Sequence, residues 1–358
     1  MQQRIDRLKE VLDKQQIDAL LITSGYNRKY MTGFTGTAGV AIVTLTEAVF
    51  ITDFRYVEQA SEQISGYTIV KHEGPISETI AEELKRLGVS RVGFEQDHVT
   101  YSQFKVFKER FSECELVPVS GSVEQLRMIK DDEELSYIRK AVDIVDETFK
   151  HILSFIKVGM TEIEVATELE FYMRKLGATS SSFDIIVASG ARSALPHGVA
   201  SHKVIEQGDF VTLDFGAYYN GYCSDMTRTF AMGEPSEKLK EIYNVCLQAQ
   251  LIGVQNIKAG MTGREADALC RDYIVSKGYG EYFGHSTGHA LGLEVHESPG
   301  LSVKVDKKLE PGMVVTVEPG IYLPGIGGVR IEDDIVITEQ GNEILNKSPK
   351  DLIIIESK

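Results

Sequence analysis

The feature that most constrains the fold is an internal repeat in the C-terminal part of the chain. Residues 157–164 read KVGMTEIE, and residues 258–265 read KAGMTGRE, 101 positions further along. Residues 208–214 (GDFVTLD) repeat as residues 312–318 (GMVVTVE), at an offset of 104 positions. Two copies are too few for a solenoid, whose terminal units need caps. We therefore expect a duplicated helix-helix-strand unit that closes around one core, with a pseudo-twofold axis and a site between its halves.

Each copy of the repeat carries helix start and stop signals. A long helix is expected to end at the glycine of the repeated segment, Gly159 or Gly260. The first of these helices is predicted from apolar residues spaced three and four apart over residues 135–156. A Thr-x-x-Glu capping box should then start the next helix in each copy, at residues 161–164 and 262–265.

A β-hairpin is predicted inside the first copy, and it brings two acids together. Residues 210–215 alternate as a strand, an Asn-Gly dipeptide forms a tight turn, and residues 223–230 run back. Asp214 and Asp225 can then meet across the hairpin, and burying unpaired carboxylates is costly. Two interpretations follow: a salt bridge to Arg228 neutralises the pair, or a divalent metal ion does.

The second copy adds two further acids. Its alignment places Glu318 at the position of Asp214, and Glu332 follows Glu318 by 14 positions, much as Asp225 follows Asp214 by 11. Four carboxylates that converge on one axis cannot all ionise without positive charge between them. One arginine cannot neutralise four acids, but two divalent cations can. An oxygen-rich site with few nitrogens suits Mn²⁺, Co²⁺ or Zn²⁺.

Histidines are concentrated near these acids. His285, His289 and His296 fall within 12 positions of a chain that has 8 histidines, and His197 follows Leu-Pro on a predicted loop. A single histidine is most often solvated or satisfied by a local hydrogen bond, but this concentration favours a functional role. The remaining histidines have no such context: His72, His98, His151 and His202.

Residues 1–122 read as a separate α/β domain. Strand-sized runs rich in β-branched residues fall at residues 19–22, 40–43, 49–52, 68–70 and 92–94, and helical patterns lie between some of these runs. The glycine-rich segment 33–39 (GFTGTAG) lacks the Gly-Lys-Ser/Thr ending of a phosphate-binding loop. We therefore expect a tight structural turn there.

Composition narrows the class of protein. A chain of 358 residues is too long for one typical core, so two domains are expected. The net charge of −15 disfavours nucleic acid and anionic membranes as partners. The N-terminal 16 residues form a charged amphipathic pattern rather than a signal peptide, and no apolar run is long enough to span a membrane. The four cysteines show no metal-ligand spacing and suggest reduced thiols in a cytoplasmic protein.

With these motifs the chain resembles the pita-bread metallopeptidases, which include Xaa-Pro dipeptidase (prolidase), aminopeptidase P and methionine aminopeptidase. Residues 131–358 resemble the catalytic domain, and residues 1–122 resemble the creatinase-like N-terminal domain of the proline-specific members, with 123–130 as a linker. Methionine aminopeptidases lack that N-terminal domain. The resemblance implies a mixed α/β (α+β) chain with a pseudo-twofold catalytic domain.

The resemblance also implies a set of metal ligands. Asp214 would bind one metal ion, Asp225 and Glu332 would bridge two, and His289 and Glu318 would complete the other site. Two divalent ions are expected, with Mn²⁺ favoured over Co²⁺ and Zn²⁺. Such a pair lowers the pKa of a shared water, so that a bridging hydroxide can attack at neutral pH.

The catalytic residues implied by the resemblance are His197, His296 and Glu318. His296 can donate to the developing oxyanion, and Glu318 can move a proton toward the leaving nitrogen. His197, His296 and Arg330 are expected to contact the substrate. The leaving nitrogen toward which Glu318 moves the proton belongs to proline. It is a tertiary amide nitrogen and must be protonated before it can leave.

The expected function is hydrolysis of the Xaa-Pro bond in dipeptides or short peptides with a free N-terminus, by a homodimer. Aminopeptidase P, which acts on longer peptides, is the first alternative. A catalytically inactive peptide-binding relative would need neither His197 nor His296. Creatinase-type hydrolysis without metal is opposed by the complete ligand set.

Overall fold

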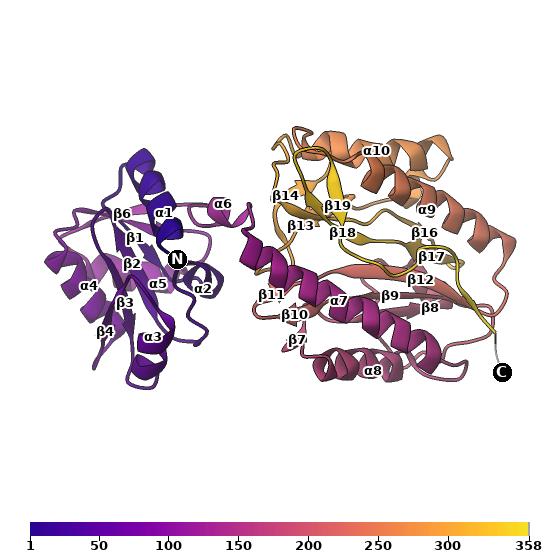
Figure 1. Ribbon diagram of the computed structural model, residues 1–358, viewed down its shortest axis with the longest axis horizontal. Coiled ribbons are helices and arrows are strands. Elements are labelled where there is room, and N and C mark those ends of the chain that lie inside the picture. The colour runs from indigo at the N-terminus through magenta and orange to yellow at the C-terminus, as the bar shows by residue number, and fades with distance from the viewer. Residues whose placement is uncertain (357–358) are drawn as a thin grey trace. The chain divides into compact units, whose positions relative to one another are not determined.

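The chain divides into two compact units in a computed structural model that describes residues 1–356. The first unit ends at Arg127 and the second begins at Met128 (Figure 1). This division falls within residues 123–130, the predicted linker. A short helix, α6 (Glu124–Arg127), occupies part of that stretch.

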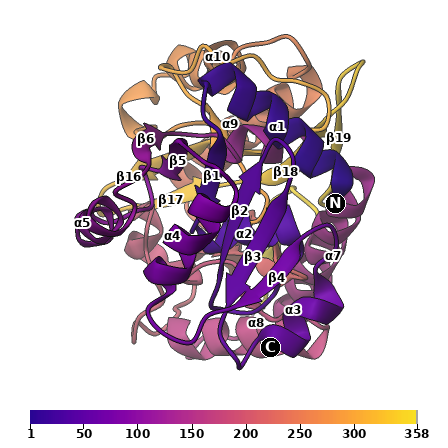
Figure 2. The same cartoon turned by 90° about the vertical axis from the view of Figure 1, so that its left-hand side faces the viewer.

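The first unit is built on a six-stranded sheet with the order β4-β3-β2-β1-β5-β6 (Figure 2). Its strands are β1 (Ala19–Ile22), β2 (Val40–Thr44), β3 (Ala48–Thr52), β4 (Thr68–Lys71), β5 (Arg91–Glu95) and β6 (Glu115–Val119). The five predicted strands are confirmed to within one residue at each end. The edge strand β6 was not predicted, because it contains Pro118 and is only partly buried, so its sequence lacks a strong strand pattern.

Helices pack against this sheet, and the glycine-rich segment joins one of them to β2. The helices are α1 (Gln2–Gln15), α2 (Gly25–Thr32), α3 (Val57–Gln63), α4 (Ile76–Arg86) and α5 (Tyr101–Arg110). In the glycine-rich segment, the carbonyls of Gly36 and Gly39 accept hydrogen bonds from the Arg28 guanidinium at 3.0 and 2.9 Å. The segment therefore has the structural turn that the sequence predicts.

The second unit contains two helix pairs with the strands between them (Figure 1). The first pair is α7 (Asp132–Phe155) and α8 (Glu162–Lys175), and the second is α9 (Glu237–Asn256) and α10 (Gly263–Ser276). Both predicted capping boxes are present, at the N-termini of α8 and α10. The long helices end before the predicted glycines, because Ile156 and Ile257 adopt extended backbone and bury their side chains.

The strands of the second unit form one larger sheet in each half and two small sheets. The first half has the order β20-β12-β9-β8, and the second has β14-β13-β15-β18-β19. The first-half strands are β7 (Ser180–Ser181), β8 (Ile186–Ser189), β9 (Phe210–Phe215), β10 (Ala217–Tyr219), β11 (Tyr222–Cys223) and β12 (Met226–Met232). Those that follow are β13 (Gly288–Ala290), β14 (Glu297–Leu301), β15 (Val314–Val317), β16 (Gly320–Leu323), β17 (Gly327–Arg330), β18 (Asp333–Ile337), β19 (Asn342–Ile344) and β20 (Ile354–Ile355).

The predicted hairpin forms, with one difference. Strand β9 has the predicted bounds, and Asn220 and Gly221 make the turn with φ of 49° and 90°. The return strand is interrupted between β11 and β12, and Asp225 lies in the interruption. In the second half, Glu332 lies in the matching interruption between β17 and β18. An acid therefore occupies the same kind of irregular position in each half.

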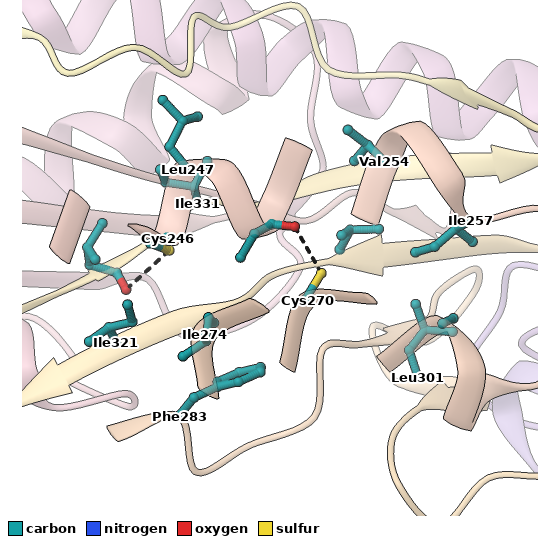
Figure 3. Close-up of a cluster of buried hydrophobic side chains, with 14 of the residues drawn as sticks. Cys246, Leu247, Val254, Ile257, Cys270, Ile274, Phe283, Leu301, Ile321 and Ile331 are labelled. Carbon is teal, nitrogen blue, oxygen red and sulfur yellow. Dashed lines mark hydrogen bonds between the residues drawn. The ribbon is translucent and has the colours of Figure 1, made fainter. Parts of the chain in front are cut away.

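Each half has its own apolar core. In the second half, residues from α9, α10 and the strands form the cluster in Figure 3. The buried thiols of Cys246 and Cys270 donate to the carbonyls of Pro319 and Ala249 at 3.1 and 3.2 Å. Burial raises the pKa of the Cys246 thiol to about 12, so it packs as a small neutral side chain. These cores hold the strands that carry the acids.

Candidate metal centre

All eight predicted site residues line one cavity of about 550 Å³ in the second unit. They come from separate segments of both halves: His197, Asp214, Asp225, His289, His296, Glu318, Arg330 and Glu332. The repeat predicted such a convergence between the halves, and the structure brings the residues together there.

The acids and His289 surround a small space. Asp225, His289 and Glu332 each offer one ligand atom, and these atoms lie within 4.8 Å of one another. His289 Nε2 lies 3.6 Å from Asp225 Oδ2 and 3.4 Å from Glu318 Oε1. Such a group of carboxylate oxygens around one imidazole nitrogen matches the donor set of a divalent transition metal.

The carboxylates are strained electrostatically. Burial, together with repulsion between the acids, raises the pKa of Asp225 and of Glu332 well above their ordinary values. Burial also raises the pKa of Glu318 to about 8. The buried oxygens Asp214 Oδ1 and Asp225 Oδ1 have no hydrogen-bonding partner among the described residues. A divalent cation would supply both the missing charge and the missing partner, so these residues fit a metal site.

His289 has the protonation state that a metal ligand needs. Its Nδ1 lies 3.1 Å from the carbonyl of Ala290, to which it can donate, and this leaves the Nε2 lone pair facing the acids. Burial and the neighbouring His296 lower the pKa of His289 to about 4. The low pKa keeps the ring neutral at pH 7, and the tautomer with its hydrogen on Nδ1 would present the Nε2 lone pair to a metal ion.

Two arginines near the acids form ion pairs that the sequence did not predict. Arg228 does not lie between Asp214 and Asp225, because its guanidinium donates to Asp333 at 2.7 Å. The salt bridge proposed between Arg228 and the two aspartates is therefore wrong. Arg330 instead donates from Nη2 to Asp214 at 2.6 Å. No ion pair joins an arginine to Asp225 among the residues that the structure describes.

Several polar residues around the acids were missed as site residues. Thr227 donates to Glu332 at 2.6 Å and accepts from Arg330 Nε at 3.0 Å. The Tyr322 hydroxyl accepts from Arg330 Nη1 at 2.7 Å and lies 2.8 Å from His285 Nε2. Strand alternation placed Thr227 on the face of Asp225, which was the available signal. Nothing in the sequence pattern singled out Tyr322.

The two flanking histidines differ in exposure and setting. His296 packs against His289 with ring centroids 4.3 Å apart. His197 follows a short 3-10 helix (Gly190–Ala194) and is exposed. Apolar side chains complete the wall of the cavity, among them Phe183, Ile186, Pro196, Val199 and Val295.

Family comparisons cover both units. The sequence matches the model of metallopeptidase family M24 over residues 136–339, and that of the creatinase/prolidase N-terminal domain over residues 4–129. These matches confirm the resemblance and the fold class that the sequence predicts. No helix of the described residues is both long and apolar enough to cross a membrane.

Individual relatives match along almost the whole chain. The uncharacterized peptidase YqhT of Bacillus subtilis is 60% identical over 98% of this chain and 100% of its own length. A solved structure of Xaa-Pro dipeptidase from Bacillus anthracis is 64% identical, covers 99% of each chain and has a TM-score of 0.98. An X-Pro aminopeptidase structure from Thermotoga maritima is 40% identical over 98% of this chain and 100% of that one, with a TM-score of 0.92.

Proposed function

The chain belongs to metallopeptidase family M24, and from this premise we propose that it hydrolyses the bond before proline in dipeptides with a free N-terminus. One observation carries the proposal: four acids and His289 converge in a cavity, and two buried carboxylate oxygens there have no partner among the described residues. Relatives that bear the names Xaa-Pro dipeptidase and X-Pro aminopeptidase support the choice of substrate.

We propose that five residues hold two divalent metal ions, with Mn²⁺ favoured and Co²⁺ or Zn²⁺ as alternatives. The proposed ligands are Asp214, Asp225, His289, Glu318 and Glu332. When bound, such ions supply a water of lowered pKa and polarise the scissile carbonyl. The unpartnered oxygens of Asp214 and Asp225 are the observation that supports this fit.

The side chains around that centre have proposed roles of their own. His296 lines the cavity beside His289 and would donate a hydrogen bond to the oxyanion that develops on the substrate. Glu318 lines the cavity beside His289, and its carboxylate would take the proton from the attacking water and pass it on. The acceptor of that proton is the proline nitrogen, which leaves as an amine.

His197 and Arg330 are proposed to contact the substrate together with His296. His197 reaches the cavity from an exposed loop, and Arg330 reaches it from the strand β17 while it holds Asp214. Apolar walls that include Phe183 and Ile186 suit the ring of proline. Proline has a fixed φ and no N–H, so a cavity of this size can select its rigid shape.

A substrate panel tests the proposal. The Mn²⁺-loaded protein should cleave Ala-Pro fastest, Ala-Pro-Ala more slowly, and Ala-Ala, Met-Ala-Ala and N-acetyl-Ala-Pro little. Faster cleavage of Ala-Ala or Met-Ala-Ala than of both proline peptides would reject the specificity. Cleavage of the acetylated peptide at a comparable rate would remove the requirement for a free N-terminus. Turnover of none of them would favour the inactive peptide-binding alternative.

The second candidate function is that of an aminopeptidase P. The likeness to the Thermotoga maritima structure favours it, because that protein is named an X-Pro aminopeptidase. A much higher kcat/KM for Ala-Pro-Ala than for Ala-Pro would select it. We also propose a cytoplasmic homodimer, and the free cysteines support the reducing compartment. Sedimentation equilibrium and cell fractionation test these two points.

A further inference from the structure

The loop that carries His197 is closed by a single buried carboxylate. Glu162 is the first residue of α8, and its side chain is fully buried. Its Oε1 accepts from the N–H and hydroxyl of Ser189 at 2.8 and 2.9 Å. Its Oε2 accepts from the N–H and hydroxyl of Ser201 at 3.1 and 2.7 Å. The two ends of the loop, residues 189–201, therefore bind the same side chain.

Arg192 ties the middle of this loop to the same carboxylate. Its Nη1 donates to Glu162 Oε2, and its Nη2 donates to the carbonyl of Val199 at 2.9 Å. The pairing compensates the buried negative charge, which would otherwise be costly. Val199 and His197 both line the cavity, so the network reaches the wall of the candidate site.

The rest of the loop is seated on both halves of the unit. A Cβ on Gly198 would lie 2.8 Å from the Cβ of Ala188, so the loop folds back closely on β8. The Ser193 hydroxyl accepts from the N–H of Gly328 in β17 at 2.8 Å. No hydrogen bond to the His197 ring occurs among the described residues, so the loop backbone sets where that ring lies.

The duplicated half argues that this carboxylate is not required by the repeat. Gly263 stands where the repeat aligns Glu162, and both helices nevertheless begin with the same capping box. A Cβ on Gly263 would lie 2.2 Å from the carbonyl oxygen of Gly300, which leaves no room for a side chain there. Glu162 is thus an addition of the first half, and it lies where the His197 loop needs an anchor.

The second half holds its own histidine-bearing segment by a different route. The buried carboxylate of Asp267 accepts from the Thr287 N–H at 3.0 Å and from Arg271 Nε at 2.6 Å. Arg271 Nη2 also donates to the carbonyl of His285 at 2.7 Å. Both halves therefore use a buried carboxylate-arginine pair beside a histidine, built from different helix positions.

We propose that Glu162 is a positioning residue that holds His197 at the wall of the active-site cavity by accepting hydrogen bonds from both ends of the loop 189–201. The inference rests on the proposed function, because that function assigns His197 to the substrate. Glu162 itself is buried under the loop and does not line the cavity. Its effect on turnover therefore runs through the histidine.

A double-mutant cycle tests this assignment on the full-length, Mn²⁺-loaded protein with Ala-Pro as substrate. Glu162→Gln keeps the shape of the side chain but replaces one carboxylate oxygen with an NH₂ group. That group cannot accept a hydrogen bond, so it would face the donors of Arg192 and Ser201 or those of Ser189. We expect kcat/KM to fall by up to about 10²-fold, the scale of a substrate contact that is misplaced by about 1 Å. In the His197→Ala background, Glu162→Gln should cause no further loss in kcat/KM.

Two further variants keep the test decisive. Glu164→Gln makes the same chemical change two residues along α8, where the carboxylate caps Thr161 and does not touch the loop, so kcat/KM should stay at the wild-type value. Arg192→Ala removes the partly exposed arginine but leaves the four hydrogen bonds from Ser189 and Ser201 to Glu162. It can therefore replace Glu162→Gln in the double-mutant cycle if that variant does not fold. It should lower kcat/KM less, and again only when His197 is present.

The outcomes separate this inference from the proposed function. If Glu162→Gln leaves kcat/KM unchanged while His197→Ala lowers it, the positioning role is rejected and the proposed function stands. An equal loss from Glu162→Gln with and without His197 also rejects the role, since the effect would then not act through the histidine. If His197→Ala is as active as the wild type, the proposed assignment of His197 fails, and the positioning role fails with it.

Discussion

The two halves of the second unit share one scaffold but carry different side chains on it. Both contain two helices, a strand with an acid near its end, and a second acid in a strand interruption: Asp214 and Asp225 in the first half, Glu318 and Glu332 in the second. The second half alone adds His289 to this group. Duplication therefore accounts for the four acids, whereas the nitrogen donor belongs to one half.

An arginine of each half forms an ion pair with one acid of the other half. Arg330 of the second half pairs with Asp214 of the first at 2.6 Å, and Arg228 of the first half pairs with Asp333 of the second at 2.7 Å. Both guanidinium groups are almost fully buried. Each ion pair joins one half to the other, so the charges pair only when the two halves pack together. The site is therefore a property of the interface between the halves and not of either half alone.

The largest expected effect concerns the acids in the two strand interruptions. Asp225→Asn and Glu332→Gln each remove a proposed bridging ligand, so both variants should lose bound metal and about 10³-fold in kcat, or roughly 4 kcal/mol. Metal content by atomic emission and kcat for Ala-Pro measure this. Chelation of the wild type should abolish activity, and Mn²⁺ or Co²⁺ should restore it.

An unequal loss of metal from the two variants would show that the halves contribute differently to the site. If one variant keeps its full metal content and the other loses it, the two interruptions are not equivalent. A metal-free preparation with full activity would end the metallopeptidase mechanism for this chain. His72→Ala is a control for a substitution outside the site, because that residue lies in the first unit and does not line the cavity.

The next largest effect separates His296 from His289, two histidines of the second half whose rings meet edge to face. His296→Ala should leave the metal bound and lower kcat by roughly 10²-fold, the scale of losing one oxyanion donor. His289→Ala should instead lower metal content. If His296→Ala loses metal and keeps kcat in the metal-saturated protein, the roles of the two histidines are exchanged.

A smaller effect concerns the stability of the chelated protein. The pKa of Glu318 is raised from 4.5 to about 8 in the folded state, so folded protein keeps a proton that unfolded protein releases. Its favourable contribution is complete below pH 4.5 and is lost as the pH rises through about 8. The free energy of unfolding should therefore fall over this range, by at most about 1.4 kcal/mol per pH unit for one group.

Urea unfolding of the chelated protein at several pH values measures that slope. Glu318→Gln should reduce it, because the amide does not titrate. Burial raises the pKa of Asp225 and Glu332 in the same direction, so some slope should remain in the variant. If the free energy of unfolding of the chelated wild type rose with pH over this range, the raised pKa values of the buried acids would be contradicted.

The sequence predicted the acids better than it predicted their partners. Asp214 and Asp225 could be found because strand alternation and an Asn-Gly turn are local signals, and the repeat extended them to Glu318 and Glu332. The pairing of Arg330 with Asp214 depends on how two segments 116 positions apart meet, and no local pattern encodes that. Local sequence patterns therefore predict which helix or strand a residue belongs to. The packing of the two halves against each other decides which charged side chains form ion pairs.

Glu162 illustrates a second limit. In the sequence it lies inside the capping box Thr161-x-x-Glu164, and that motif fully explained its neighbours. Its contacts with Ser189 and Ser201 join residues 27 and 39 positions away, which only the folded chain brings together. A buried carboxylate at a helix start has no sequence signature that separates it from an exposed one.

The smallest predicted effect is the sharpest test of equivalence between the halves. The capping boxes of α8 and α10 are near copies: Glu164 N donates to Thr161 Oγ1 at 3.3 Å, and Glu265 N donates to Thr262 Oγ1 at 3.1 Å. In each box the glutamate reaches back to the threonine N–H at 2.7 Å. Thr161→Ala and Thr262→Ala should therefore each lower the free energy of unfolding by about 1 kcal/mol.

Equal losses would mean that the two helix starts contribute alike although their surroundings differ. The expected difference between the variants is small, because both boxes are exposed and make the same bonds. Urea unfolding of the metal-loaded protein gives both values, and kcat/KM for Ala-Pro should not change in either variant. A loss in kcat/KM confined to Thr161→Ala would mean that the N-terminus of α8 affects the His197 loop through the adjacent Glu162. The two helix N-termini would then be equivalent in their capping hydrogen bonds but not in their effect on activity.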